Sequence, residues 1–445
     1  MLTPLLSLRD DEILGEGSLD PLGLYATADR LAVQLVPGVR ERQQHPRFLT
    51  ALAVSLHVAS SFPDDIVASD GVSEPWQVFE WYMVEFMVRT ASGGDELRGL
   101  PGRDKATSAI RDNVPLSAKR YLKTPSVYGF HGVYRILARE LEVQVANQLG
   151  GPGYQLLETW ADEQNLAGFV GTGGGDGHLV LQRLREAIDD GLDSGCVARK
   201  ANWRYGEFFS KHLGHYEVGP KEARILHEII RSPGKGFRRQ VLDFLAADAG
   251  QKLTRPFAEG SESLGSVERR VHEAMSRTAP PELRRLLEAI QAYEHFARLL
   301  QDAFDDCRQR LTAVHGKVFP AELEQLEGIR SSCRELPTVF ATTHDKLCQA
   351  DDALAAEFAD QFGFASEQSD GKAWVERLID HHLRIQRGKL PNGKKPWIDR
   401  YDDGGLVLQP AYRVEKGGRH DRSYVHGYRT QPLTSFLADL GRVRA

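Results

Sequence analysis

The stretch that decides the fold is residues 280–316, PPELRRLLEAIQAYEHFARLLQDAFDDCRQRLTAVHG. Its apolar residues recur in alternating steps of three and four, at Leu283, Leu286, Ile290, Tyr293, Ala297, Leu300, Phe304, Cys307, Leu311 and Val314. This spacing is typical of a coiled coil or of a long helix in a bundle. At 1.5 Å per residue, such a helix would be roughly 50 Å long. The stretch therefore predicts one long helix with a continuous apolar seam.

A return limb follows this helix. Pro320 opens a second helical pattern through Leu323, Leu326 and Ile329, and we expect Pro337 to interrupt it. Residues 280–366 are therefore predicted to form a long antiparallel helical hairpin. The pattern is equally consistent with an arm that projects from the protein and with helices packed along a bundle.

Helical patterns also dominate the first part of the chain. Pro75–Arg89, PWQVFEWYMVEFMVR, is apolar on nearly every side, which indicates a helix in the middle of a bundle. We expect an N-terminal helical domain over residues 1–170 and a middle helical domain over residues 171–279. Two helices within residues 126–165 resemble a helix-turn-helix, a pairing that ordinary helical bundles also contain. The predicted fold class is mainly α.

The last part of the chain differs in kind, and we expect residues 370–445 to form a small α+β module. A helix at its start is followed by Asp402-Asp403-Gly404-Gly405, a turn signal between two strand-like runs. Further short strands are predicted at residues 412–414 and 423–428. A helix over Leu433–Leu440 closes the module.

Charge is distributed unevenly along the sequence. The net charge is -6, but residues 372–429 carry 13 Lys and Arg against 7 Asp and Glu. Aromatic residues are interleaved with these cations, which suits contact with a nucleic-acid backbone and equally suits docking onto an acidic protein surface. The candidate contact residues are Arg384, Arg387, Lys389, Lys394, Lys395, Trp397, Arg400 and Arg413.

Motifs for catalysis or for cofactor binding are scarce, so we expect no catalytic residue and no cofactor. The glycine cluster in GFVGTGGGDGHLVLQRLREAI, residues 168–188, lacks dinucleotide-fingerprint spacing and contains no lysine for a phosphate. One alternative remains open. His315, His344, Asp345 and Asp380 follow the ligand order of metal-dependent phosphohydrolases of the HD type, in which histidine and carboxylate bind a metal.

Composition indicates a reduced, cytosolic protein. The opening residues MLTPLLSLRDDEILGEG lack a basic segment and turn acidic early, unlike a secretion signal. Four widely spaced cysteines suggest neither a zinc site nor a disulfide framework. No apolar run approaches the roughly 18 residues that span a bilayer, so we expect no membrane partner.

Three segments resemble bacterial proteins encoded in antiphage defence islands: residues 20–48, residues 128–141 (YGFHGVYRILAREL) and residues 427–441 (GYRTQPLTSFLADLG). The resemblance transfers no catalytic residue. It implies a component that works beside a helicase, nuclease or methylase on DNA. The leading hypothesis is a non-catalytic accessory subunit that binds DNA or protein subunits through the basic module. An HD-like phosphohydrolase or nuclease and a purely structural scaffold are the alternatives.

Overall fold

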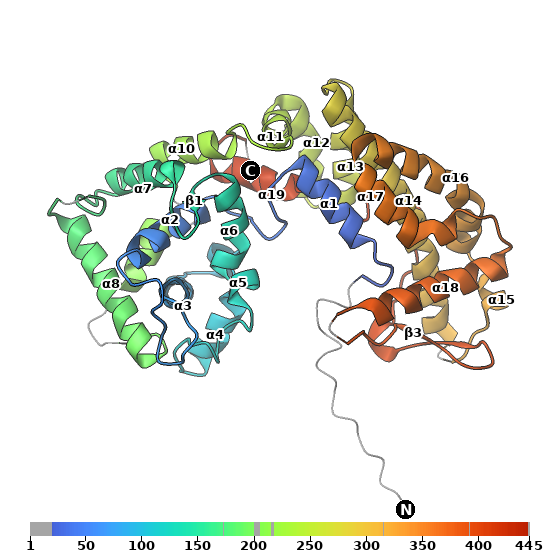
Figure 1. Ribbon diagram of the computed structural model, residues 1–445, viewed down its shortest axis with the longest axis horizontal. Coiled ribbons are helices and arrows are strands. Elements are labelled where there is room, and N and C mark those ends of the chain that lie inside the picture. Colours follow the sequence, from blue (N-terminus) through green and yellow to red (C-terminus); the bar gives the residue numbers. More distant parts are fainter. Residues whose placement is uncertain are drawn as a thin grey trace, which may run out of the picture. The chain divides into compact units, whose positions relative to one another are not determined.

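A computed structural model describes residues 20–171, 173–199, 205–214, 218–314, 316–390 and 392–443. In this part of the chain the elements are nineteen α-helices, short 3-10 turns and two antiparallel sheets of two strands each (Figure 1). The prediction of a mainly α protein is confirmed. Among the helices of the described residues, none combines the length and the apolar composition that a membrane span requires.

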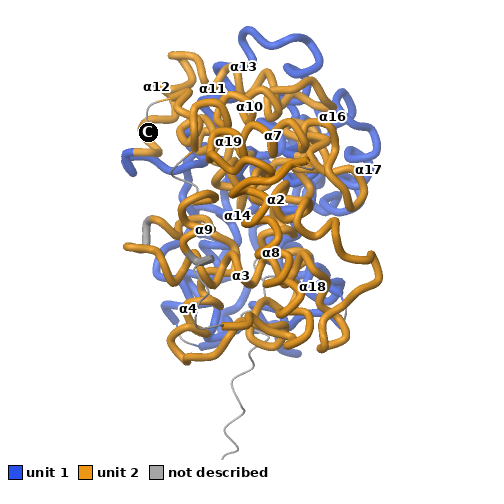
Figure 2. The backbone as a smooth tube through the Cα atoms, turned by 90° about the vertical axis from the view of Figure 1, so that its left-hand side faces the viewer, with its two compact units in different colours: residues 1–32, 259–428 blue, residues 33–258, 429–445 orange. Residues whose placement is uncertain are grey.

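The chain forms two compact units, each built from two separate segments (Figure 2). Unit 1 comprises Met1–Ala32 and Glu259–Tyr428, and unit 2 comprises Val33–Ala258 and Arg429–Ala445. This division differs from the four expected domains. The expected boundary at 170/171 lies inside unit 2, and the expected module over residues 370–445 is shared between the units. Helix α1 (Tyr25–Leu35) carries the chain from one unit into the other.

Unit 2 is built around two apolar helices, α2 (Phe48–Ala59) and α3 (Pro75–Thr90). Ten of the twelve residues of α2 are buried, since it packs against α3 and against four further helices. Helix α3 matches the predicted buried helix at residues 75–89. The remaining helices of unit 2 are α4 (Arg103–Arg111), α5 (Pro125–Tyr128), α6 (Phe130–Glu140), α7 (Gly151–Glu163), α8 (Asp176–Ser194), α9 (Tyr205–Leu213), α10 (Pro220–Ile230), α11 (Arg238–Ala246), α12 (Asp248–Ala258) and α19 (Thr430–Asp439).

The predicted helix pair at residues 126–165 contains an additional element. Between α6 and α7 lies a hairpin of two short strands, β1 (Gln144–Val145) and β2 (Gln148–Leu149). The connection is therefore a β-hairpin rather than the simple tight turn that was expected. The aromatic residues Phe130 and Tyr134 of α6 are fully buried.

A fully buried ion pair joins α2 to α10 in unit 2. Arg47, at the N-terminal end of α2, lies 3.1 Å from a carboxylate oxygen of Glu222, and neither side chain has exposed area. Thr50 donates a hydrogen bond of 2.6 Å to the same carboxylate. Burial raises the pKa of Glu222, while Arg47 and Thr50 act in the opposite direction. Arg47 also donates to the carbonyl of His212 at 3.1 Å.

Loss of one partner of the buried pair of Arg47 and Glu222 should strongly destabilise the folded protein. Arg47→Met leaves the Glu222 carboxylate buried without its counter-charge, and we expect a loss of about 3 to 5 kcal/mol in the free energy of unfolding. Urea titration measures the change. Arg103→Met, which breaks the exposed pair with Asp104, is the control and should cost less than about 0.5 kcal/mol. Equal losses in the two variants would contradict the interpretation.

Unit 1 is organised by α14 (Pro281–Val314), the 34-residue helix at the predicted position. Nine of its ten predicted seam residues are buried; Val314, the last, is 40% exposed. Its other helices are α13 (Leu264–Ser276), α15 (Pro320–Leu323), α16 (Glu327–Ala350), α17 (Asp352–Phe362) and α18 (Gly371–Gly388).

Helices α14 and α16 run antiparallel along each other. The amide of Gly328 donates to Asp306 at 2.8 Å, the Thr343 hydroxyl donates to the carbonyl of Ala292 at 3.1 Å, and Lys346 pairs with Glu288 at 2.7 Å. The predicted interruption at Pro337 is wrong, because α16 continues through this residue. Packing of neighbours such as the fully buried Leu336 outweighs the helix-breaking cost of about 3 kcal/mol.

The chain after α18 forms one hairpin and then irregular structure. Strands β3 (Ile398–Arg400) and β4 (Leu406–Leu408) pair antiparallel around the predicted Asp402–Gly405 turn. A 3-10 turn, Pro410–Tyr412, follows. The strands predicted at residues 412–414 and 423–428 are wrong, since these described residues contain no strand.

Candidate functional site

Three of the predicted contact residues are engaged within unit 1. The Arg384 guanidinium donates to the carbonyl of Gln361 and to Nδ1 of His381. The Lys389 ammonium donates to the carbonyl of Asp20 at 2.6 Å, and burial lowers its pKa. Arg400 pairs with the carboxylate of Asp380. These three cations therefore already have partners within unit 1.

Trp397 lies in the core of unit 1 rather than on its surface, with 6% of its area exposed. Its ring stacks on Tyr412 at 4.5 Å between centroids, and the Arg308 guanidinium lies 4.7 Å from the indole centroid. The backbone N–H of Trp397 donates to Nε2 of His382 at 2.9 Å, while Nδ1 of His382 donates to the carbonyl of Pro21 at 2.9 Å. His382 therefore fixes the start of β3 only while its Nε2 is unprotonated.

This arrangement predicts a pH dependence. Burial lowers the pKa of His382 to about 4, from 6.5 for an unperturbed histidine. Between about pH 6.5 and pH 4, His382 is therefore protonated in the unfolded chain but not in the folded chain. The free energy of unfolding should fall as the pH drops through this range. The loss from His382 amounts to about 3 kcal/mol. His382→Gln should make this part of the stability curve shallower in urea titrations across pH. His212, His272 and His381, whose pKa burial also lowers, keep the rest of the slope. Gln349→Ala, at an exposed position of α16, changes no titratable group and should leave the slope of the wild type unchanged.

Four predicted cations remain. Arg387, Lys395 and Arg413 are exposed, and Lys394 is half-buried. They come from the end of α18, the loop before β3 and the segment after the 3-10 turn, so the structure does not place all eight residues in one element. Arg413 begins a segment with a more regular arrangement.

Residues 413–428, which we call the strap, are held on unit 1 by buried carboxylates. Asp306 accepts from the amide of Gly418 at 2.8 Å, and Asp302 accepts from the next two amides at 3.0 and 3.1 Å. Glu294 accepts from His426 and from the Tyr428 hydroxyl, and Glu268 accepts the Tyr428 amide with both oxygens. Because the strap has no ladder of its own, these carboxylates satisfy six of its backbone N–H groups, those of residues 418–420, 425, 426 and 428.

A buried cation satisfies strap carbonyls as well. Arg298 on α14 donates to the carbonyl of Ser423 at 2.9 Å and to that of Tyr424 at 3.1 Å. It also forms an ion pair with Asp302 at 3.3 Å. Burial raises the pKa of Asp302, and Arg298 and the strap amides oppose that shift. The buried charges of Arg298 and Asp302 are thus satisfied by each other and by hydrogen bonds to the strap backbone.

The strap carries exposed cations at intervals of three residues: Arg413, Lys416, Arg419 and Arg422. Two exposed acids, Glu415 and Asp421, lie among them. Only Arg413 was a predicted contact residue. The signal that could have identified the others is the repeat itself, in RVEKGGRHDR, residues 413–422. This strap, with its backbone fixed and its cations accessible, is the candidate binding surface of unit 1.

The anchoring can be tested directly. Asp306→Asn replaces an acceptor of two backbone amides, those of Gly328 and Gly418, and should free the strap locally. We expect hydrogen exchange at the strap amides 418–420 to accelerate by about 10-fold, because a charged hydrogen bond contributes roughly 1.5 to 3 kcal/mol. Asp305→Asn, one residue earlier on α14, is the control. Unchanged exchange in Asp306→Asn would show that the carboxylate does not hold the strap.

The alternative metal site gains no support from the described residues. His315 lies outside them. Asp380 is paired with Arg400, and the ring of His344 lies against Phe340. Within the described ranges, no three His, Cys, Asp or Glu side chains are grouped so that they could hold a metal ion.

Comparison with protein-family models, curated proteins and solved structures found no match to this chain.

Proposed function

We propose that the protein is a non-catalytic subunit of a DNA-acting complex, with the strap of unit 1 contacting phosphates. The observation that carries the proposal is the row of exposed cations on a segment whose backbone is anchored by buried carboxylates. The resemblance to proteins of antiphage defence islands supports a setting in phage defence, with further protein subunits as partners.

Spacing on the strap suits a polyanion. Three residues span at most about 10 Å even when fully extended, so neighbouring cations of the strap are close enough to contact nearby phosphates. Each DNA strand presents one phosphate about every 3.4 Å of helix axis. Arg and Lys contacts of this kind position a protein on DNA without reading its sequence. We therefore infer binding that is sensitive to salt and tolerant of sequence.

Preorganisation favours the strap over a flexible basic tail. Because its amides and carbonyls are already bonded to Glu268, Glu294, Asp302, Asp306 and Arg298, binding need not order the backbone. Less conformational entropy is then lost on association. The α14–α16 pair serves in this proposal as the rigid support beneath the strap, and the other faces of unit 1 remain for protein partners.

The test compares two variants with the same change in charge. The strap variant combines Arg413→Ala, Lys416→Ala, Arg419→Ala and Arg422→Ala. The control replaces four exposed, scattered cations of unit 2, namely Lys105, Arg183, Lys235 and Lys252. Affinity for duplex and single-stranded DNA is measured at several salt concentrations between 50 and 200 mM.

We expect the wild type to bind DNA with a steep salt dependence. The strap variant should reduce the slope of log K against log salt by roughly 3 to 4 for duplex DNA, and the control should leave it nearly unchanged. Absence of salt-dependent binding by the wild type, or equal losses in both variants, would contradict the proposal. The scaffold alternative would then gain support.

A further inference from the structure

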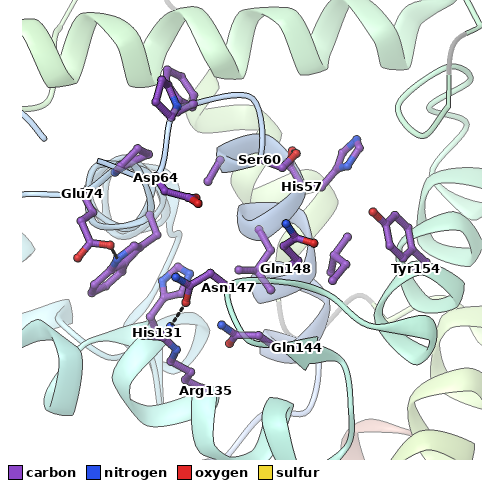
Figure 3. Close-up of a pocket in the computed structure, with 17 residues that line it drawn as sticks. His57, Ser60, Asp64, Glu74, His131, Arg135, Gln144, Asn147, Gln148 and Tyr154 are labelled. Carbon is purple, nitrogen blue, oxygen red and sulfur yellow. Dashed lines mark hydrogen bonds between the residues drawn. The ribbon is translucent and has the colours of Figure 1, made fainter. Parts of the chain in front are cut away.

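Unit 2 contains a polar cavity of about 290 Å³, and no strap residue lines it. Figure 3 draws its lining residues. It lies where the end of α2, the start of α3, α6 and the β1–β2 hairpin meet. The volume lies just below the usual range of about 300 to 1,000 Å³ for small-molecule sites. Its lining combines an aromatic wall, carboxylates, amides and an arginine.

The inner wall is organised by a buried glutamate on α3. Glu80 accepts hydrogen bonds from the Tyr121 hydroxyl at 2.6 Å, from the amides of Phe130 and His131 at 2.8 and 3.1 Å, and from Nδ1 of His131 at 3.3 Å. Burial and the neighbouring Glu80 raise the pKa of Tyr121 well above its usual value, so the hydroxyl remains a donor. A side chain at Gly129 would collide with Glu80, since its Cβ would lie 2.3 Å from a carboxylate oxygen.

This contact fixes the chemistry that His131 offers to the cavity. Nδ1 donates to the carboxylate, so Nε2 is the ring nitrogen left for a ligand, and it accepts a hydrogen bond when the ring carries only the Nδ1 proton. Nε2 is buried and has no hydrogen-bond partner in the described part of the chain. The ring of Trp76 lies 4.8 Å away and forms the adjacent wall.

Two more buried polar atoms in the lining lack a partner among the described residues: Nε of Arg135 and Oε1 of Gln144. Arg135 lies one turn after His131 on α6, and its terminal nitrogen donates to Asn147 at 2.7 Å. Burial lowers the pKa of Arg135. The Gln144 amide nitrogen donates to the carbonyl of Ala146, which leaves its oxygen as an acceptor. Buried polar groups are normally paired, so three such groups in the lining of one cavity make it a candidate ligand site.

The unpaired atoms define a complementary ligand. Arg135 supplies a cationic donor, while His131 Nε2 and Gln144 Oε1 supply acceptors. Asp64 and Glu74 add carboxylates to the lining, and Glu74 accepts from the Trp76 indole at 2.8 Å. A ligand that fits has an acceptor edge next to donor groups and a flat face for Trp76.

We propose that this cavity binds a purine nucleobase, and specifically guanine. Guanine presents O6 and N7 as acceptors for arginine, and its ring and exocyclic N–H groups face the acceptors of the cavity. Its π-face can stack on an aromatic side chain. The proposal is independent of the strap, because every lining residue belongs to unit 2.

The experiment measures binding of guanosine, adenosine, cytidine and glutamate to the full chain by isothermal titration calorimetry. Guanosine should bind tightest. Arg135→Ala should weaken guanosine binding by about 10-fold or more, because it removes a charged hydrogen bond. Trp76→Leu, which removes the stacking face, should weaken it by a similar factor.

The matched control is Arg139→Ala, on the same helix, whose exposed side chain does not line the cavity. It should change guanosine affinity by less than about 2-fold, and so should the strap variant. Circular dichroism and thermal unfolding establish that each variant is folded. The proposal is overturned if 1 mM guanosine gives no binding heat, if another probe binds more tightly, or if Arg135→Ala and Arg139→Ala have equal effects.

Discussion

Unit 1 depends on carboxylates that are buried along α13 and α14 and accept hydrogen bonds from backbone amides. An irregular segment has no ladder of its own, so each buried N–H must find another acceptor or lose free energy. Glu268, Glu294, Asp302 and Asp306 provide those acceptors for the strap. The long apolar seam supports the same helix from its other side, so one element anchors both the core and the strap.

Unit 2 uses the same device around α3. Glu80 gathers donors from α6 and from Tyr121, and the fully buried Glu85 accepts from the amide of Leu116 at 2.9 Å and from Arg199 at 2.9 Å. In the sequence, Glu80 and Glu85 appear only as interruptions of an apolar pattern. In the structure, hydrogen bonds to these buried acids attach the neighbouring segments to α3. The net charge of -6 includes these internal carboxylates and is a poor guide to the charge at the surface.

Periodicity predicted what depends on neighbours in sequence. The seam of α14 and the all-round apolar character of α3 gave correct helices, because both patterns repeat every three or four residues. Periodicity could not predict contacts between residues that are far apart in the sequence. Trp397 was expected at a binding surface, but its burial depends on Phe304 and Tyr412. The cavity likewise depends on Glu80 meeting His131, 51 residues away, a pairing that no local pattern encodes.

The division of the chain has a consequence for the order in which the protein can fold during synthesis. Unit 2 includes Arg429 and α19, which follow the whole second segment of unit 1. Asp439 accepts from His45 at 2.7 Å, and the buried Arg429 pairs with Glu41 at 3.0 Å. Residues 33–258 must therefore leave the ribosome without these partners and wait while about 170 more residues are made. Unit 2 is the first unit to be largely synthesised and the last to be completed.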